Sequence, residues 1–132
     1  IGFQEMFNAA IHKKTHALDN DGFYPLPKNK GKLIPADLSK YYPKRNKAYE
    51  EIRAICQKNN INLIAITTPI CINTINRDYF NHIKSVYPEI HNFENAVVDD
   101  KYFSTCGHMN RDGAVEFTKI VFNAFFKPKT AP

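Results

Sequence analysis

The sequence has no tryptophan, little glycine and methionine, and no long apolar run. Of its 132 residues, five are Gly, two are Met and three are Cys. No apolar stretch approaches the roughly 18 residues that a membrane-spanning helix needs, so we predict no membrane span. The cysteines are odd in number and lack C-x-x-C spacing, which fits neither a disulfide framework nor a zinc ribbon. These absences exclude the membrane-spanning and disulfide-scaffold classes.

What is present is typical of one folded domain. Hydrophobic residues make up 43% of the chain, and its ten Phe and seven Tyr suggest a core built on phenylalanine. The length suits a single domain over residues 1–132 and not two. The chain opens on Ile1 without the pattern of a secretory signal peptide, and we interpret it as an excised or processed piece of a longer protein.

Positive charge is concentrated in one proline-rich region. The sequence holds 18 Lys and Arg against 13 Asp and Glu, and much of the excess lies between Lys28 and Lys47. Tyr41 and Tyr42 interleave this basic run, as a nucleic-acid stacking surface would require. Prolines nevertheless break the region, so we interpret residues 19–43 as an extended, solvated Pro- and Lys-rich loop and expect no nucleic-acid partner.

Hydrophobic periodicity predicts four amphipathic helices. They run from Phe3 to before Asp19, from Lys44 to Lys58, from Asp78 to Val86, and from the N-cap Asn110 onward. In the second helix, one face carries Ala48, Ile52, Ile55 and Cys56, and the other carries Lys, Glu and Arg. In the last helix, the residues expected to face inward are Ala114, Phe117, Ile120, Val121 and Phe125.

Two strands are expected between these helices. Residues 61–70 are almost continuously apolar, as in a parallel strand that is buried on both faces, and a short second strand is expected near residues 90–93. The order of helices and strands predicts an α/β protein with a partial parallel sheet. Because two strands leave open edges, we expect either a missing N-terminal half or self-association to cover them.

The richest candidate for chemistry is the loop before the last helix. Polar groups gather beyond the carboxyl ends of parallel strands, and this loop places His108 two residues before the N-cap Asn110. Gly107 leaves the approach to the imidazole uncrowded. A loop histidine in this position is a candidate general base, although such a histidine often serves as a structural hydrogen-bond donor.

The residues around His108 resemble a family motif. Tyr102-Phe103, His108-Met109-Asn110, Asp112-Gly113-Ala114 and Phe117-Thr118 follow one another in this order. This string resembles the C-terminal motif of the SGNH (GDSL-type) hydrolases, and the resemblance extends over about residues 44–126. It implies a three-layer α/β/α fold of the SGNH or flavodoxin-like kind.

The resemblance also implies roles for three residues. His108 matches the catalytic general base, and Asn110 matches the residue that caps the last helix behind it. Thr105 stands three residues before His108, where the family has the triad aspartate. The implied activity is hydrolysis or transfer of a small acyl ester, including acetyl esters of carbohydrates, without a cofactor or a metal. The family further implies an extracytoplasmic location, in the periplasm or cell envelope.

The nucleophile of the family is not found in the sequence. The serines are Ser39, Ser85 and Ser104, and none has the flanking glycines that would build an oxyanion hole. We therefore expect this segment to be inactive alone, as the C-terminal part of a larger SGNH-like domain. The alternative function is a noncatalytic binding or structural module that uses the basic loop 22–43 as its contact surface.

Other residues are weaker candidates for ligands or acids. Cys106 lies near His108, and His12 and His16 are four residues apart, but none has the partners of a metal or thiol site. His82 and His91 are interpreted as surface or packing residues. Asp99 and Asp100 could replace the missing triad acid only if the loop folds back onto His108.

Overall fold

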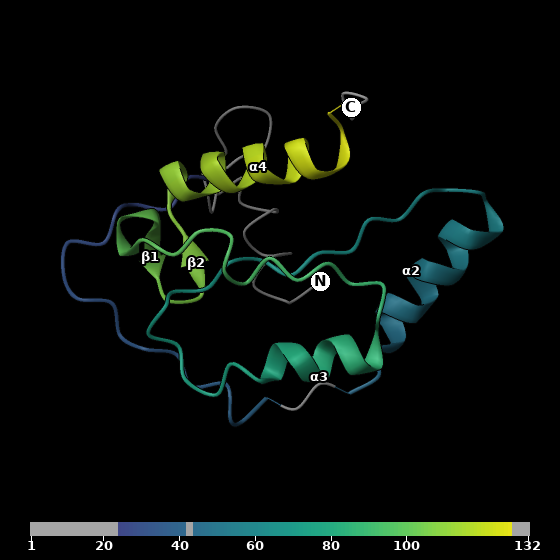
Figure 1. Cartoon of the computed structure of the whole chain (residues 1–132), viewed down its shortest axis with the longest axis horizontal. Helices are drawn as coiled ribbons and strands as arrows, with labels where there is room; N and C mark the ends of the chain where they lie inside the picture. Colours follow the sequence, from purple (N-terminus) through teal and green to yellow (C-terminus); the bar gives the residue numbers. More distant parts are fainter. Residues whose placement is uncertain (1–23, 42–43, 128–132) are drawn as a thin grey trace, which may run out of the picture.

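The computed structural model describes residues 24–41 and 44–127 (Figure 1). Within them it contains helices α2 (Lys47–Lys58), α3 (Tyr79–Val86) and α4 (Arg111–Phe125), the 3-10 helix η2 (Asp100–Tyr102), and strands β1 (Phe103–Thr105) and β2 (His108–Met109). β1 and β2 pair antiparallel, so the described chain is a mixed α/β structure. The helix predicted from Phe3, with His12 and His16, lies outside the described residues.

The predicted helices over the described residues are present and begin at or near the expected caps. The side chain of Asn110 accepts a hydrogen bond from the backbone N–H of Gly113, which confirms it as the N-cap of α4. α3 follows Asp78 as predicted. α2 begins three residues later than Lys44, because Asn46 accepts from the backbone N–H of Tyr49 and fixes the start there.

The apolar face that the sequence pattern identified on α2 is largely exposed. No residue of α2 is buried; Ile52 is 49% and Ile55 59% exposed. Figure 1 shows why, because α2 projects from one side of the molecule. Its contacts with the described body come from one edge, where the rings of Tyr49 and Tyr87 meet edge to face at 4.8 Å and Arg53 pairs with Glu89 at 3.1 Å.

The predicted strands 61–70 and 90–93 are extended chain rather than regular strands. One parallel bridge joins Ile66 and His91. Around it Thr67 N–H donates to the His91 carbonyl at 3.0 Å, and His91 N–H donates to the Ala65 carbonyl at 2.9 Å. The predicted parallel direction is therefore present, but the ladder stays short because no further strand of the described chain supports it. The regular sheet of the described residues is instead the hairpin β1–β2, which the apolar pattern did not predict.

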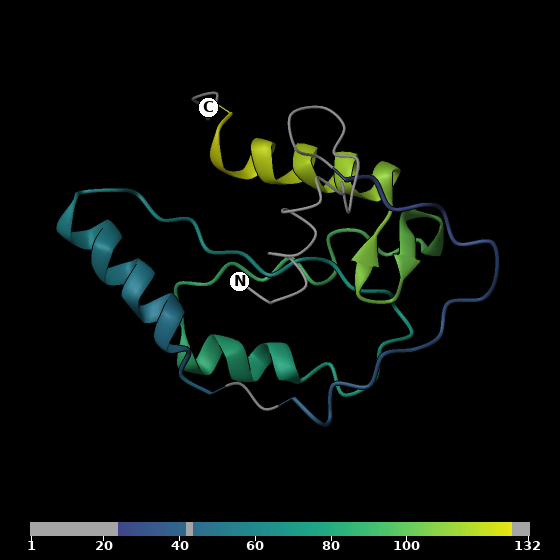
Figure 2. The ribbon, with the colours of Figure 1, turned by 180° about the vertical axis from the view of Figure 1, so that it is seen from behind.

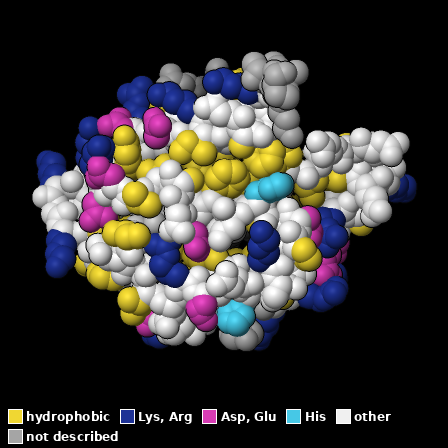
Figure 3. Space-filling model, viewed as in Figure 1, with side chains coloured by type: hydrophobic (Ala, Val, Ile, Leu, Met, Phe, Trp, Pro, Cys, Tyr) yellow, Lys and Arg dark blue, Asp and Glu magenta, His cyan; other side chains and the backbone are white. Residues whose placement is uncertain are grey.

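These extended segments run between two helices. α4 lies on one side of them and α3 on the other in both views (Figures 1 and 2). On the face toward the viewer, a band of hydrophobic side chains lies beneath α4 (Figure 3). The buried cluster at the centre consists of Leu33, Cys71, Val97, Phe103, Cys106 and Phe117.

The inner face of α4 was correctly predicted. Phe117 is buried, and Ile120 and Val121 pack against the central cluster. The rings of Phe117 and Phe125 both meet Phe93 edge to face, at centroid distances of 5.9 and 6.1 Å. Phe103 is 0% exposed, so phenylalanine contributes to the core as the composition predicted.

The described part of the basic loop, residues 24–41, is ordered chain without a helix or strand, as predicted. Leu33 anchors it in the core at 3% exposure. Farther on, a parallel bridge joins Asp37 to Ile75, with Leu38 N–H donating to the Ile75 carbonyl at 3.2 Å and Ile75 N–H donating to the Ala36 carbonyl at 2.9 Å. The loop is thus tied to the body of the molecule at two places.

A search of the described helices for a membrane span found none with the length and apolar character that crossing a bilayer requires.

Candidate functional site

The hairpin β1–β2 presents the candidate histidine. Phe103 pairs with Met109 and Thr105 pairs with His108, with an irregularity in the register between the two pairs. Phe103 is fully buried, whereas His108 is exposed. The hairpin is therefore anchored in the core at one end, and it carries the imidazole at its turn.

Thr105 contacts the imidazole of His108 directly. The distance between Thr105 Oγ1 and His108 Nδ1 is 2.9 Å, which is within hydrogen-bond range. Among the described residues, none forms a hydrogen bond or ion pair with Nε2. One ring nitrogen is thus held by the protein, while the other is open to an incoming group.

A hydroxyl does not impose the tautomer that a carboxylate would impose. Ionised carboxylates only accept hydrogen bonds, so an aspartate opposite Nδ1 keeps that nitrogen protonated and leaves the Nε2 lone pair basic. The hydroxyl of Thr105 can accept from Nδ1–H or donate to a bare Nδ1. Thr105 therefore orients the ring of His108 but does not select the basic tautomer or stabilise the imidazolium with a charge.

Asn110 joins the hairpin to the helix behind it. The side chain is 1% exposed and fully hydrogen-bonded: Oδ1 accepts from Gly113 N–H, and Nδ2 donates to the carbonyls of Lys101 at 2.7 Å and Phe103 at 3.5 Å. Its backbone N–H donates to the Tyr102 carbonyl at 2.9 Å. This buried amide fixes the end of β2 against the first turn of α4, which is the supporting place predicted for it.

Gly113 allows the close approach between α4 and η2. A Cβ atom on Gly113 would clash with the carbonyl oxygen of Tyr102. A Cβ on Gly107, in the turn before His108, would meet no atom within 4 Å. Of these two glycines of the motif region, only Gly113 is required by packing.

The two carboxylates considered as substitute acids do not reach His108. The carboxylate of Asp99 accepts from Lys101 N–H at 3.0 Å and pairs with Lys101 Nζ at 2.8 Å. These hydrogen bonds hold the pKa of Asp99 below its usual value. Asp100 begins η2, and no hydrogen bond or ion pair of the described residues joins it to His108. The hypothesis that either replaces the triad acid is wrong, because Asp99 caps the 3-10 turn instead.

The serines of the described chain are likewise engaged elsewhere. Ser85 Oγ donates to the His82 carbonyl at 2.7 Å, and Ser104 Oγ donates to the Pro27 carbonyl. Ser39 lies in the loop, where its N–H donates to Asp37 at 2.9 Å. None of the three forms a hydrogen bond with His108, so no serine of the described residues is paired with this histidine.

A disulfide bond between Cys71 and Cys106 was missed by sequence analysis. The two Cα atoms lie 4.7 Å apart, the cysteines are 35 residues apart in sequence, and both are buried. Cys71 N–H also donates to the Cys106 carbonyl at 3.0 Å. The bond fastens the β1–β2 turn, beside Thr105, to the end of the extended segment 61–70. Because its sulfur is in the disulfide, Cys106 is neither a free nucleophile nor a thiolate ligand. No motif in the sequence indicated that Cys71 and Cys106 would pair.

Within the described residues, no group of three or more His, Cys, Asp or Glu side chains is placed to hold a metal ion. The rings of His91 and Phe125 meet edge to face, with their centroids 4.8 Å apart. On α3, His82 Nε2 lies 3.4 Å from Oδ2 of Asp78, the residue before the helix. Both fit the surface or packing roles that the sequence suggested.

Searches of family models, curated proteins and solved structures found no match to this chain.

Proposed function

We propose that this chain is the C-terminal part of an SGNH-type acyl-ester hydrolase or acyltransferase and supplies its catalytic histidine, His108. The observation that carries the proposal is the hydrogen bond between Thr105 Oγ1 and His108 Nδ1 at 2.9 Å, while no described residue forms a hydrogen bond or ion pair with Nε2. It is the arrangement that a general base needs: one nitrogen oriented, the other accessible.

In the proposed reaction, His108 Nε2 accepts the proton of a serine hydroxyl as the serine oxygen attacks the ester carbonyl. The imidazolium then returns that proton to the departing alcohol, leaving an acyl-serine that water or a second alcohol releases by the same steps in reverse order. The serine is assigned to a part of the protein other than the described residues, because Ser39, Ser85 and Ser104 do not contact His108.

The arrangement of the core supports the proposed three-layer α/β/α fold. Extended segments with a parallel bridge at Ile66 and His91 lie between α3 and α4, as the last two strands of such a sheet would. Further parallel strands would have to add beside residues 61–70. The buried disulfide Cys71–Cys106 supports the extracytoplasmic location in this proposal, since disulfides persist in oxidising compartments.

The proposal is tested by measuring ester hydrolysis with the full-length polypeptide that the gene encodes. With p-nitrophenyl acetate as substrate, His108→Ala should lower kcat/KM by about 10²- to 10⁴-fold, the usual contribution of a general base. His82→Ala, which removes a histidine from α3, is the control and should leave the rate unchanged. Equal rates for wild type and His108→Ala would remove His108 from the mechanism.

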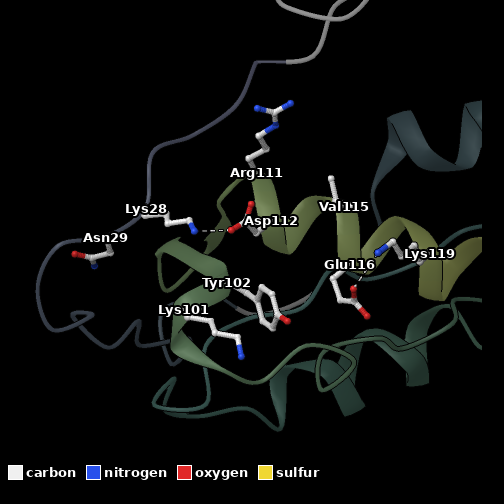
Figure 4. Close-up of a pocket in the computed structure, with 9 residues that line it drawn as sticks. All are labelled: Lys28, Asn29, Lys101, Tyr102, Arg111, Asp112, Val115, Glu116 and Lys119. Atoms are coloured by element: carbon white, nitrogen blue, oxygen red, sulfur yellow. Dashed lines mark ion pairs between the residues drawn. The ribbon is translucent and has the colours of Figure 1, made fainter.

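One observation favours the alternative of a noncatalytic binding module. The basic loop carries Lys28 and Asn29 to the wall of a surface cavity at the start of α4 (Figure 4), and neither Thr105 nor His108 lines this cavity. A binding module would use this cavity without any ester hydrolysis. Loss of hydrolysis in His108→Ala therefore distinguishes the two functions.

A further inference from the structure

The end of the β1–β2 hairpin that carries His108 has one buried residue. Of residues 105–108, Thr105, Gly107 and His108 are exposed, whereas Cys106 is only 3% exposed. A Cβ atom on Gly107 would meet no atom within 4 Å. A two-stranded hairpin alone is at best marginally stable in water, so the shape of its turn depends on where the turn is attached. At this end of the hairpin, the attachment is made through Cys106.

Cys106 is attached to Cys71 in two ways. The sulfur atoms form the disulfide, and the backbone N–H of Cys71 donates to the carbonyl of Cys106 at 3.0 Å. One bond holds the side chain of Cys106 and the other holds its main chain, so both the position and the orientation of the turn are fixed. The opposite end of the hairpin is held separately, by the buried side chains of Phe103 and Asn110.

Cys71 is firmly held in the core. Its exposed fraction is 0%, and its carbonyl accepts from Thr74 N–H at 3.1 Å. The residue before it, Ile70, donates its N–H to the Glu94 carbonyl at 3.3 Å. The guanidinium of Arg77 reaches the carbonyls of Cys71 and Glu94 at 3.5 and 3.4 Å. The disulfide therefore joins an otherwise exposed turn to a well-braced part of the molecule.

The attached residue lies between the two residues of the candidate site. Cys106 follows Thr105 directly and precedes His108 by two residues, and Thr105 and His108 form the pair of the hairpin next to the turn. Their side chains meet at 2.9 Å, and both are exposed, so water competes for each partner of this hydrogen bond. The contact therefore depends on a turn that keeps the two side chains facing each other.

We infer that the Cys71–Cys106 disulfide positions the Thr105–His108 pair, by holding the turn in the shape that keeps Thr105 Oγ1 beside His108 Nδ1. The bond acts through these two residues and takes no part in the proton transfer itself. Resting on the proposed function, the imidazole is oriented for catalysis only in the oxidised protein. Reduction by a dithiol breaks the S–S bond, adds a proton to each sulfur and converts the dithiol to a disulfide. The turn is then released while the core stays folded.

NMR of the whole chain tests the positioning without requiring activity. The imidazole ¹⁵N shifts of His108 and the NOEs between its ring and the Thr105 side chain are recorded for three samples. These are the oxidised protein, the protein reduced with dithiothreitol, and the variant Cys71→Ala with Cys106→Ala. The Cβ ¹³C shifts of both cysteines report the oxidation state. Removing the disulfide should abolish the NOEs and move the ¹⁵N shifts toward those of free imidazole, while the amide shifts of α4 change little. Cys56→Ala, which removes the free cysteine of α2, is the control and should match the oxidised protein.

Steady-state kinetics give a second readout that a merely structural role would not produce. With p-nitrophenyl acetate, the double variant should lower kcat by about 10- to 10²-fold, because a misplacement of about 1 Å in a reacting group costs up to that factor. KM should stay nearly unchanged, since the bond does not bind substrate. Cys56→Ala should keep the wild-type kcat.

Two NMR results would overturn the inference. If the NOEs and the His108 shifts persist after the disulfide is removed, the turn keeps its shape without the bond. If the native amide spectrum is lost throughout the chain, the bond holds the whole fold and not the turn. Because no ester is cleaved in the NMR experiment, its result is independent of the proposed function. Loss of the NOEs in a protein whose oxidised form hydrolyses no ester would support the positioning and contradict the catalytic role of His108.

Discussion

At the scale of single residues, the site depends on what stands opposite His108 Nδ1. Thr105 fills this place with a hydroxyl at 2.9 Å, so the imidazole is oriented without a negative charge behind it. In the proposed reaction the imidazolium that forms after proton transfer is correspondingly less stable than with an aspartate. The site is therefore expected to work below the rate of a complete triad.

Replacing Thr105 tests this account. Thr105→Asp should raise kcat for p-nitrophenyl acetate by up to about 10⁴-fold, since removing the aspartate charge from a serine-protease triad lowers kcat by about that factor. Thr105→Val, which keeps the shape but removes the hydroxyl, should lower kcat and broaden the tautomer distribution of His108. The readouts are kcat and the ¹⁵N shifts of the imidazole. A Thr105→Asp variant no faster than Thr105→Val would contradict the orienting role.

Gly113 offers a second test at this scale, of stability rather than activity. Gly113→Ala should destabilise the protein by about 1–3 kcal/mol, because its Cβ would overlap the Tyr102 carbonyl and force α4 away from η2. Gly107→Ala is the matched control, since its Cβ enters open space. Urea unfolding of both variants measures the difference. Similar midpoints for the two would show that the close approach at Gly113 is not required.

The residues of the site were partly predictable from the sequence. The local helix pattern predicted Asn110 as the N-cap, and the resemblance of the motif implied the place of Thr105 near the imidazole; both depend on contacts within a few residues. The disulfide could not be predicted, since Cys71 and Cys106 are 35 residues apart and only the tertiary fold brings them together. The same holds for Gly113, whose requirement comes from the Tyr102 carbonyl.

At the scale of elements, helices were predictable and strands were not. α3 and α4 follow from local periodicity and capping, which the sequence contains within one segment. A strand needs a neighbouring strand to which its backbone can hydrogen-bond. Within the described chain, residues 61–70 form a single β-bridge, between Ile66 and His91. Burial likewise depends on a neighbour: periodicity identifies the apolar face of α2, but it does not provide a partner that would cover Ile52 and Ile55.

The hydrogen bond between Asp37 in the basic loop and Asn76 predicts that the attachment of this loop depends on pH. The carboxylate of Asp37 accepts from Ser39 N–H and from Asn76 Nδ2, at 2.9 and 2.7 Å, and these bonds lower its pKa. A carboxyl with a lowered pKa stabilises the fold at pH values above its unfolded-state pKa. This contribution is lost as the pH falls through the folded-state pKa, so the loop should loosen only in acid, below about pH 4.

Asn76→Gly tests this tie. Asn76 has a φ of 58°, which glycine tolerates, so the substitution removes the side-chain hydrogen bond without straining the backbone. The pKa of Asp37 should rise toward its usual value, as measured by NMR titration. Asn60→Gly is the control, because Asn60 has a similar φ of 54° and does not contact Asp37. An unchanged Asp37 pKa in Asn76→Gly would show that Asn76 does not contribute to lowering it.

At the scale of the whole molecule, the Cys71–Cys106 disulfide joins the centre of the chain to the hairpin. Closing a loop of this length should stabilise the fold by about 3–4 kcal/mol through the lost entropy of the unfolded chain. The paired substitution Cys71→Ala with Cys106→Ala should lower the free energy of unfolding by that amount. Cys56→Ala removes the free cysteine and should have little effect. A double variant as stable as Cys56→Ala would mean that the bond does not form in solution.

The central claim is that His108 acts as a general base, and chemical rescue of His108→Ala tests it most directly. Hydrolysis of p-nitrophenyl acetate is measured for wild type, His108→Ala and His82→Ala, each with increasing imidazole and corrected for hydrolysis by imidazole alone. The account predicts a loss of about 10²- to 10⁴-fold in His108→Ala. It also predicts that imidazole partly restores that variant in proportion to its concentration, with no gain for the other two proteins. An unchanged rate in His108→Ala, or a loss that imidazole does not restore, would contradict it.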